Sequence, residues 1–96
     1  MDNEQRKRRL VEIGGRIRKF REEKGLNLHE LALLSGVSAP ALSLIETGKR
    51  DLRITTLCQI AAALRVAAGD LLDDGTKELR AVGTGRDEGY NLGDYT

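Results

Sequence analysis

The stretch of sequence that decides the fold is residues 27–50, NLHELALLSGVSAPALSLIETGKR. Asn27 predicts the N-cap of a helix, and Glu30, three residues further on, completes an Asx version of the capping box. Gly36 predicts the end of this helix, because glycine readily adopts the left-handed conformation found after a helix C-terminus. The first half of the stretch therefore predicts a short helix that ends at residue 35.

The second half of the stretch predicts another short helix, separated from the first by the three residues 36–38. Ser38 is its expected N-cap, and Pro40 falls in its first turn, where the missing N–H costs nothing. Since a residue before proline is pushed away from helical backbone angles, Ala39 is the alternative cap. Gly48 predicts the helix end. Two short helices joined by a three-residue turn with glycine form the arrangement that presents a second helix to the major groove of DNA.

Apolar residues at helical spacing predict three further helices outside this stretch. The first precedes Gly25, and residues 1–9 either extend it or form a basic N-terminal arm. The other two fill residues 54–72. We therefore predict an all-α domain of five helices over residues 10–72. Its expected apolar stripes are Leu10, Ile13, Ile17 and Phe20, then Leu57, Ile60, Ala61 and Leu64, and finally Val66, Leu71 and Leu72.

Charge divides the chain into two regions. The 16 Lys and Arg against 15 Asp and Glu give a net charge of +1. Residues 1–72 hold 13 basic and 9 acidic groups, a net charge of +4, whereas residues 73–96 hold 3 basic and 6 acidic groups, a net charge of −3. The second region has five glycines, which predicts an acidic, Gly-rich tail or linker, with a possible short strand over residues 79–82.

The sequence lacks the residues that several classes of function require. One cysteine, Cys58, and one histidine, His29, cannot supply the four ligands of a zinc site, and no nucleophile is paired with a base, so we expect no metal, no cofactor and no enzyme. No apolar run approaches the roughly 20 residues of a membrane span, which predicts a cytoplasmic protein. Cys58 is expected as an apolar filler of the fourth helix, His29 as a surface residue, and Glu46 in a structural pair.

Several segments together resemble the phage repressor/Cro-like helix-turn-helix family, also called the xenobiotic response element family. They are residues 15–18, 26–32, 35–38, 45–50 and 57–64, with Ile45-Glu46-Thr47-Gly48 as the most specific mark. The resemblance covers about two thirds of the chain. It implies a lambda-repressor-like domain that binds operator DNA as a homodimer, associates with the nucleoid and inserts residues 39–47 in the major groove. Residues 49–57 also resemble controller proteins of restriction–modification systems.

The resemblance implies a set of DNA contacts. Phosphate contacts map to the start of the second helix and to the loop after the third, and base contacts map to the outward side of the third helix. Of the expected base readers only Ser43 can form hydrogen bonds, so bidentate base contacts, worth roughly 1–3 kcal/mol each, are not available. The basic residues 6–9 are a further candidate for the backbone or minor groove. The expected DNA-binding residues are Asn27, Leu28, Ser38, Ala39, Pro40, Ser43, Leu44, Thr47, Lys49 and Arg50.

Two alternatives to this function stay open. Leucines stand where the family usually places polar groups, and Leu33, Leu44 and Leu52 predict an apolar patch that binds a protein partner instead of DNA. The chain is otherwise the N-terminal DNA-binding part of a longer sensor-regulator. For the dimer, the expected contacts lie in and near the fifth helix, at Leu64, Val66, Leu71 and Leu72.

Overall fold

The computed structural model describes residues 2–73, which form five helices and, within that range, no strand. The prediction of an all-α, five-helix domain is confirmed. The helices are α1 (Asn3–Glu23), α2 (Leu28–Ser35), α3 (Ala39–Glu46), α4 (Ile54–Leu64) and α5 (Ala68–Leu72). The strand predicted over residues 79–82, and the acidic tail beyond Asp73, lie outside the described residues.

Helix α1 begins earlier than the apolar stripe alone indicated. The Asp2 carboxylate accepts a hydrogen bond from the Gln5 amide at 2.8 Å, and the Gln5 side chain accepts one from the Asp2 amide at 3.2 Å, which makes a capping box. Residues 3–9 are therefore a helix extension, and the alternative of a basic arm is wrong. A helix, about 10 Å across, does not fit the minor groove, which is roughly 6 Å wide.

The caps of α2 and α3 follow the sequence signals. Asn27 and Glu30 exchange side-chain to backbone hydrogen bonds at 2.7 and 2.8 Å, and Gly36 ends α2 with φ +78°. The Ser38 hydroxyl accepts from the Ala41 amide at 3.3 Å, so Ser38 is the cap of α3 and the alternative cap, Ala39, is wrong. The axes of α2 and α3 differ in direction by 110°, as expected for a helix-turn-helix.

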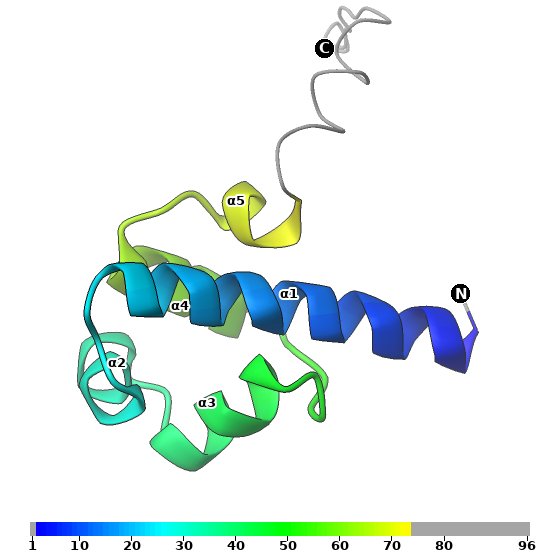
Figure 1. Cartoon of the computed structure of the whole chain (residues 1–96), viewed down its shortest axis with the longest axis horizontal. Coiled ribbons are helices and arrows are strands. Elements are labelled where there is room, and N and C mark those ends of the chain that lie inside the picture. Colours follow the sequence, from blue (N-terminus) through cyan, green and yellow to red (C-terminus); the bar gives the residue numbers. More distant parts are fainter. Residues whose placement is uncertain (1, 74–96) are drawn as a thin grey trace, which may run out of the picture.

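The core lies where the five helices meet around α1. Figure 1 shows α2 and α3 on one side of α1 and α5 on the other, with α4 running behind α1. Every helix contributes aliphatic side chains, and the expected stripes are mostly buried. The buried apolar residues are Ile13, Ile17, Leu31, Leu42, Ile45, Leu57, Ile60, Ala61, Leu64 and Leu71. Cys58 is exposed, so its expected role as a filler of α4 is wrong. His29 lies on the surface, as predicted.

The length and apolar character of the helices bear on whether one of them could span a membrane. Taken singly, none of those in residues 2–73 combines enough length with enough apolar character to cross a membrane. The sharply bent pair α2 and α3 meets the length and composition requirement only when its two helices are counted together.

Candidate nucleic-acid interface

The inward face of α3 is fixed against α1 by close packing. Leu42 and Ile45 are buried, and Gly14 of α1 lies against the backbone carbonyls of Ile45 and Glu46. A Cβ atom at Gly14 would lie 2.3 Å from the Ile45 oxygen, so only glycine allows this approach. Sequence analysis did not single out Gly14 and missed this contact between α1 and α3.

A buried ion pair also joins α1 to α3. The Arg21 guanidinium donates from Nε to Glu46 Oε2 at 2.7 Å and from Nη2 to Oε1 at 3.0 Å. The two side chains are only 11% and 5% exposed. The hydrogen bonds to Glu46 raise the pKa of Arg21 above its ordinary value. The structural role expected for Glu46 is confirmed, and its charge is held away from the outward face of α3.

The Arg21 side chain also fixes the chain between α1 and α2. Its Nη1 donates to the Leu26 carbonyl at 2.8 Å. One guanidinium thus connects α1, the segment before α2 and the end of α3. Because Arg21 places both helices of the helix-turn-helix unit relative to α1, it sets the direction in which α3 faces solvent.

The outward face of α3 carries the residues expected to read bases. Pro40, Ser43, Leu44 and Thr47 are exposed, and Ala39 is half-buried. The Thr47 hydroxyl donates to the Ser43 and Leu44 carbonyls at 2.9 and 3.2 Å, so its proton is used within the helix. The Ser43 hydroxyl makes no hydrogen bond to the described residues. Ser43 therefore offers both a donor and an acceptor on a face that is otherwise mostly apolar.

Cations follow α3 directly. Gly48, with φ +73°, turns the chain, and the exposed Lys49 and Arg50 come next. Arg53, the residue before α4, is also exposed. None of these three cations has a carboxylate within 4.0 Å among residues 2–73. Three unpaired positive charges close to α3 fit a polyanionic ligand better than an intramolecular network.

Two of these arginines line a polar groove between the α2–α3 turn and α4. The groove has a volume of about 400 Å³, and its lining includes Arg50, Arg53, Thr56 and Gln59. Sequence analysis missed Arg53 because it looked for contacts only immediately after α3. The signal was present, since Arg53 is the next basic residue in the same loop.

The start of α2 places two further predicted phosphate contacts. The side-chain Oδ1 of Asn27 accepts the hydrogen bond of the cap, which leaves the side-chain NH₂ as a donor. Leu28 packs partly against the core and has no polar side-chain atom. Within residues 2–73 the amides of Leu28 and His29 have no acceptor. Any phosphate contact of Leu28 must therefore use the backbone N–H at the positive end of the helix.

The apolar patch expected at Leu33, Leu44 and Leu52 is only partly present. Leu33 is 75% exposed and Leu44 is 42% exposed. Leu52 is half-buried and packs partly against the core, so it offers less apolar surface than Leu33 and Leu44, and its role in a protein contact stays a prediction. A loop residue has no periodicity that assigns its side chain to a face, and the burial of Leu52 follows from contacts that are distant in sequence. Leu34, at 61% exposure, extends the apolar surface on α2.

The expected dimer contacts need a similar correction. Leu64 and Leu71 are fully buried within one chain, because α5 folds back on α1 and α4. They cannot contact a second copy in this fold. Val66 and Leu72 are half-buried and remain on the α5 side of the molecule.

No three His, Cys, Asp or Glu side chains lie close enough within residues 2–73 to hold a metal ion.

Comparison with known proteins identifies related chains over this region. A family model described as "Helix-turn-helix" (HTH_3) matches residues 17–71. The HTH-type transcriptional repressor RghR of Bacillus subtilis is 43% identical over 58 residues, which are 59% of this chain and 43% of RghR. The HTH-type transcriptional regulator SinR of the same organism is 41% identical over 63 residues, 65% of this chain and 57% of SinR. This chain thus spans about half the length of these relatives.

A solved structure shares both the fold and part of the sequence. The restriction-modification controller protein C.AhdI from Aeromonas hydrophila superposes with a TM-score of 0.66 and 32% sequence identity. The match covers 68% of this chain and 94% of C.AhdI. The similarity therefore extends over the described helices and is not limited to α2 and α3.

Proposed function

The chain belongs to the helix-turn-helix family HTH_3, and from this premise we propose that it is a transcription regulator that binds operator DNA. Helix α3 enters the major groove, and the protein associates with the nucleoid through this binding. One observation supports the proposal most strongly. The carboxylate of α3, Glu46, is turned inward to Arg21, while unpaired Lys49, Arg50 and Arg53 follow α3 on the surface. This arrangement removes repulsion from the DNA face and adds attraction next to it.

The outward face of α3 determines what kind of DNA sequence is preferred. Ser43 offers hydrogen bonds to a base edge, and Pro40 and Leu44 offer apolar contact to thymine methyl groups. Without an Arg–guanine or Gln–adenine pair, the discrimination is modest at each base pair. We infer that DNA shape supplies part of the preference, together with phosphate contacts from the cations after α3.

A homodimer fits this mode of binding. Two copies of α3 would occupy half-sites about one helical turn, roughly 10 base pairs, apart. With Leu64 and Leu71 buried, Val66 and Leu72 remain of the four residues expected at the dimer contact, and we place the contact there. Because the matched relatives are longer than this chain, the domain also fits the DNA-binding part of a larger regulator.

A salt titration of binding to a random pool of DNA duplexes tests the proposal. We expect the logarithm of the binding constant to fall linearly with the logarithm of the salt concentration. Lys49→Ala and Arg50→Ala should each reduce the slope by about one and weaken all sequences alike. Lys19→Ala, which removes the same charge from the side of α1 that faces α5, should change neither value. Absence of bound DNA at low salt would reject the proposal.

A second candidate function is binding of a protein partner through the exposed leucines. Leu33 and Leu34 occupy two neighbouring exposed positions of α2, at 75% and 61% exposure, which favours an apolar contact there. Loss of a protein complex on Leu33→Ser and Leu34→Ser, with DNA binding unchanged or absent, would favour this candidate. Loss of DNA binding on Lys49→Ala and Arg50→Ala would favour the first.

A further inference from the structure

The first turns of α1 project from the domain. Figure 1 shows the N-terminal end of α1 extending past α3 and α5, and residues 2–8 are all exposed. These turns hold one carboxylate after the cap, Glu4, and three cations, Arg6, Lys7 and Arg8. The match to the helix-turn-helix family begins at residue 17, so the turns lie outside it. Neither the core nor the family match accounts for this basic part of α1.

The loop after α3 touches α1 next to these turns. A Cβ atom at Gly48 would lie 2.6 Å from Val11 Cγ2 and 2.8 Å from the Val11 nitrogen, so the two backbones are in close contact there. Lys7 stands four residues before Val11, about 6 Å along the helix axis and on nearly the same face of α1. Lys7 and the loop that carries Lys49 and Arg50 therefore belong to one surface.

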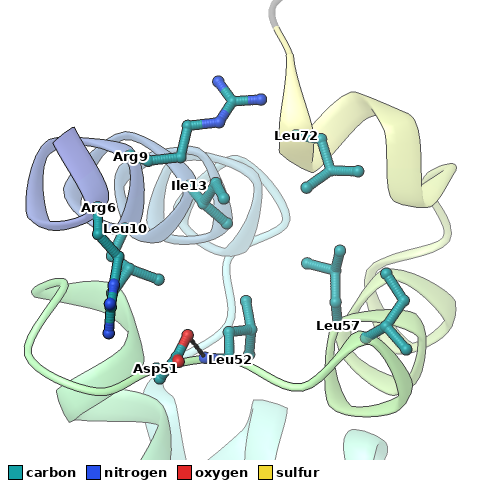
Figure 2. A pocket seen from close by; sticks show the side chains of 9 residues that line it. Arg6, Arg9, Leu10, Ile13, Asp51, Leu52, Leu57 and Leu72 are labelled. Atoms are coloured by element: carbon teal, nitrogen blue, oxygen red, sulfur yellow. Dashed lines mark hydrogen bonds between the residues drawn. The ribbon is translucent and has the colours of Figure 1, made fainter. Parts of the chain in front are cut away.

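Arg6 approaches the same loop from the adjacent side of α1. It lines a hollow of about 240 Å³ together with Asp51 of the loop and Arg9 of α1. Figure 2 shows the Arg6 side chain extending toward Asp51 and the Arg9 side chain extending away from the loop. Arg9 also has a carboxylate partner, Glu12, at 3.6 Å. The basic run at residues 6–9 is thus divided, with Arg6 and Lys7 next to the loop and Arg9 on another side of α1.

The surface shared by α1 and the loop is positively charged. Arg6 and Lys7, like Lys49 and Arg50, have no carboxylate within 4.0 Å among residues 2–73. Asp51 Oδ1 accepts a hydrogen bond from the amide of the next residue at 2.8 Å, so this carboxylate is engaged by the backbone. The Debye length is about 10 Å at 0.1 M salt, so cations on neighbouring segments repel one another. A polyanion that contacts all four relieves this repulsion.

We propose that Arg6 and Lys7 bind DNA phosphates next to those bound by Lys49 and Arg50. This inference rests on the proposed DNA binding by α3, and it lengthens the stretch of DNA that one copy covers. Duplex DNA carries one negative charge per roughly 1.7 Å of its axis, so phosphates continue beyond those beside α3. A helix is too wide for the minor groove, so the first turns of α1 contact the backbone from outside. Such contacts carry no base specificity.

A salt titration of DNA binding by the full chain tests the contact. Each lost phosphate contact lowers the slope of log K against log salt by about 0.9, so Arg6→Gln with Lys7→Gln should lower it by about two. The loss of affinity should be the same for all duplexes. Lys7→Arg keeps the charge and should keep the slope. Arg9→Gln removes the same charge from another side of the same turn and should leave the slope unchanged.

Directed cleavage locates the contact independently of affinity. An iron chelate attached at Glu4→Cys, in a Cys58→Ser background, lies one turn before Lys7 and leaves both cations in place. We expect it to cleave the DNA backbone beside the base pairs that α3 covers. Glu23→Cys is the matched control, because it is the same substitution at an exposed position of the other end of α1, and its chelate should not cleave.

The possible outcomes separate this inference from the proposed function. Equal falls in slope for Lys7→Gln and Arg9→Gln would indicate a general effect of charge and would overturn the contact. An unchanged slope for Arg6→Gln with Lys7→Gln, where Lys49→Ala still lowers it, would overturn the contact and leave DNA binding by α3 standing. Absence of DNA binding by the unaltered chain at low salt would reject both. Urea denaturation verifies that each variant stays folded.

Discussion

The two faces of α3 have opposite characters. Several independent contacts hold the inward face in place. Leu42 and Ile45 are buried, Gly14 packs on the backbone of α3, and Glu46 pairs with Arg21. The outward face carries Pro40, Ser43 and Leu44, which have few hydrogen-bonding groups. The inward face fixes where the helix lies, and the outward face sets what it contacts. Changes on the first should therefore affect folding, and changes on the second should affect only recognition.

The largest expected effect follows from breaking the buried ion pair. Arg21→Met leaves the Glu46 carboxylate buried without its partner, which typically costs about 3–5 kcal/mol. Urea denaturation measures this as a fall in the free energy of unfolding. Replacing both residues with apolar ones, Arg21→Met with Glu46→Leu, should recover part of the loss, because no buried charge is then left unpaired.

An exposed ion pair on the same helix is the matched control. Arg18 and Glu22 are 3.1 Å apart, and their side chains are 61% and 56% exposed. Arg18→Met should lower the free energy of unfolding by no more than about 1 kcal/mol, since solvent screens this pair. Equal losses for Arg18→Met and Arg21→Met would contradict the view that the inward face of α3 is held by its buried pair.

The next effect compares two adjacent glycines of α1. Gly14→Ala places a Cβ against the backbone of α3, and overpacking of this kind costs about 1–3 kcal/mol. Gly15 has no atom within 4 Å of such a Cβ, so Gly15→Ala should raise stability by about 0.5–1 kcal/mol through helix propensity. Thermal unfolding should show a lower midpoint temperature for Gly14→Ala and a higher one for Gly15→Ala if the contact of α1 with α3 is as close as described.

The sequence predicts what depends on neighbouring residues. Asn27 with Glu30, and Ser38 with Ala41, form their caps within four residues, so the α2 and α3 boundaries follow from local signals. The contact of Gly14 with α3 joins residues far apart in the chain, and no local pattern distinguishes Gly14 from Gly15. The five-helix fold was thus predictable, and the closeness of α1 to α3 was not.

Two wrong expectations have different causes. Cys58 stands one position from Leu57, about 100° around α4 from the stripe that Leu57 forms with Ile60, Ala61 and Leu64, so stricter use of the periodicity would have placed it on the surface. The complete burial of Leu71 within one chain depends on the return of α5 to α1. That return is a tertiary feature which the five residues of α5 do not encode locally.

The candidate DNA contacts were also predictable only in part from the sequence. Lys49 and Arg50 were assigned by the family resemblance, which implies phosphate contacts in the loop after the third helix. The groove that unites Arg50 with Arg53 and Gln59 needs the relative position of α3 and α4, which only the structure supplies. The inward orientation of Glu46 was anticipated because a carboxylate facing DNA would be repelled.

On the outward face, Leu44→Ala should change recognition and leave stability nearly intact. The side chain is 42% exposed, so the free energy of unfolding should move by no more than about 0.5 kcal/mol. Loss of apolar contact with a thymine methyl group should lower affinity for the preferred sequence by about 1–2 kcal/mol. Selection from random DNA before and after the change measures this. Leu33→Ala, the same substitution on α2, should leave the selected sequence unchanged.

The smallest effect is expected for Ser43→Ala, and it examines the outward face most directly. The hydroxyl has no partner within residues 2–73, so its removal should not change the free energy of unfolding measurably. If it bonds a base edge, affinity for the preferred base should fall by about 0.5–1 kcal/mol, the net value of one hydrogen bond. Competition between duplexes that differ at one base pair resolves such a difference. An equal loss for all duplexes would instead place Ser43 against a phosphate, and the outward face of α3 would then read bases through apolar contacts alone.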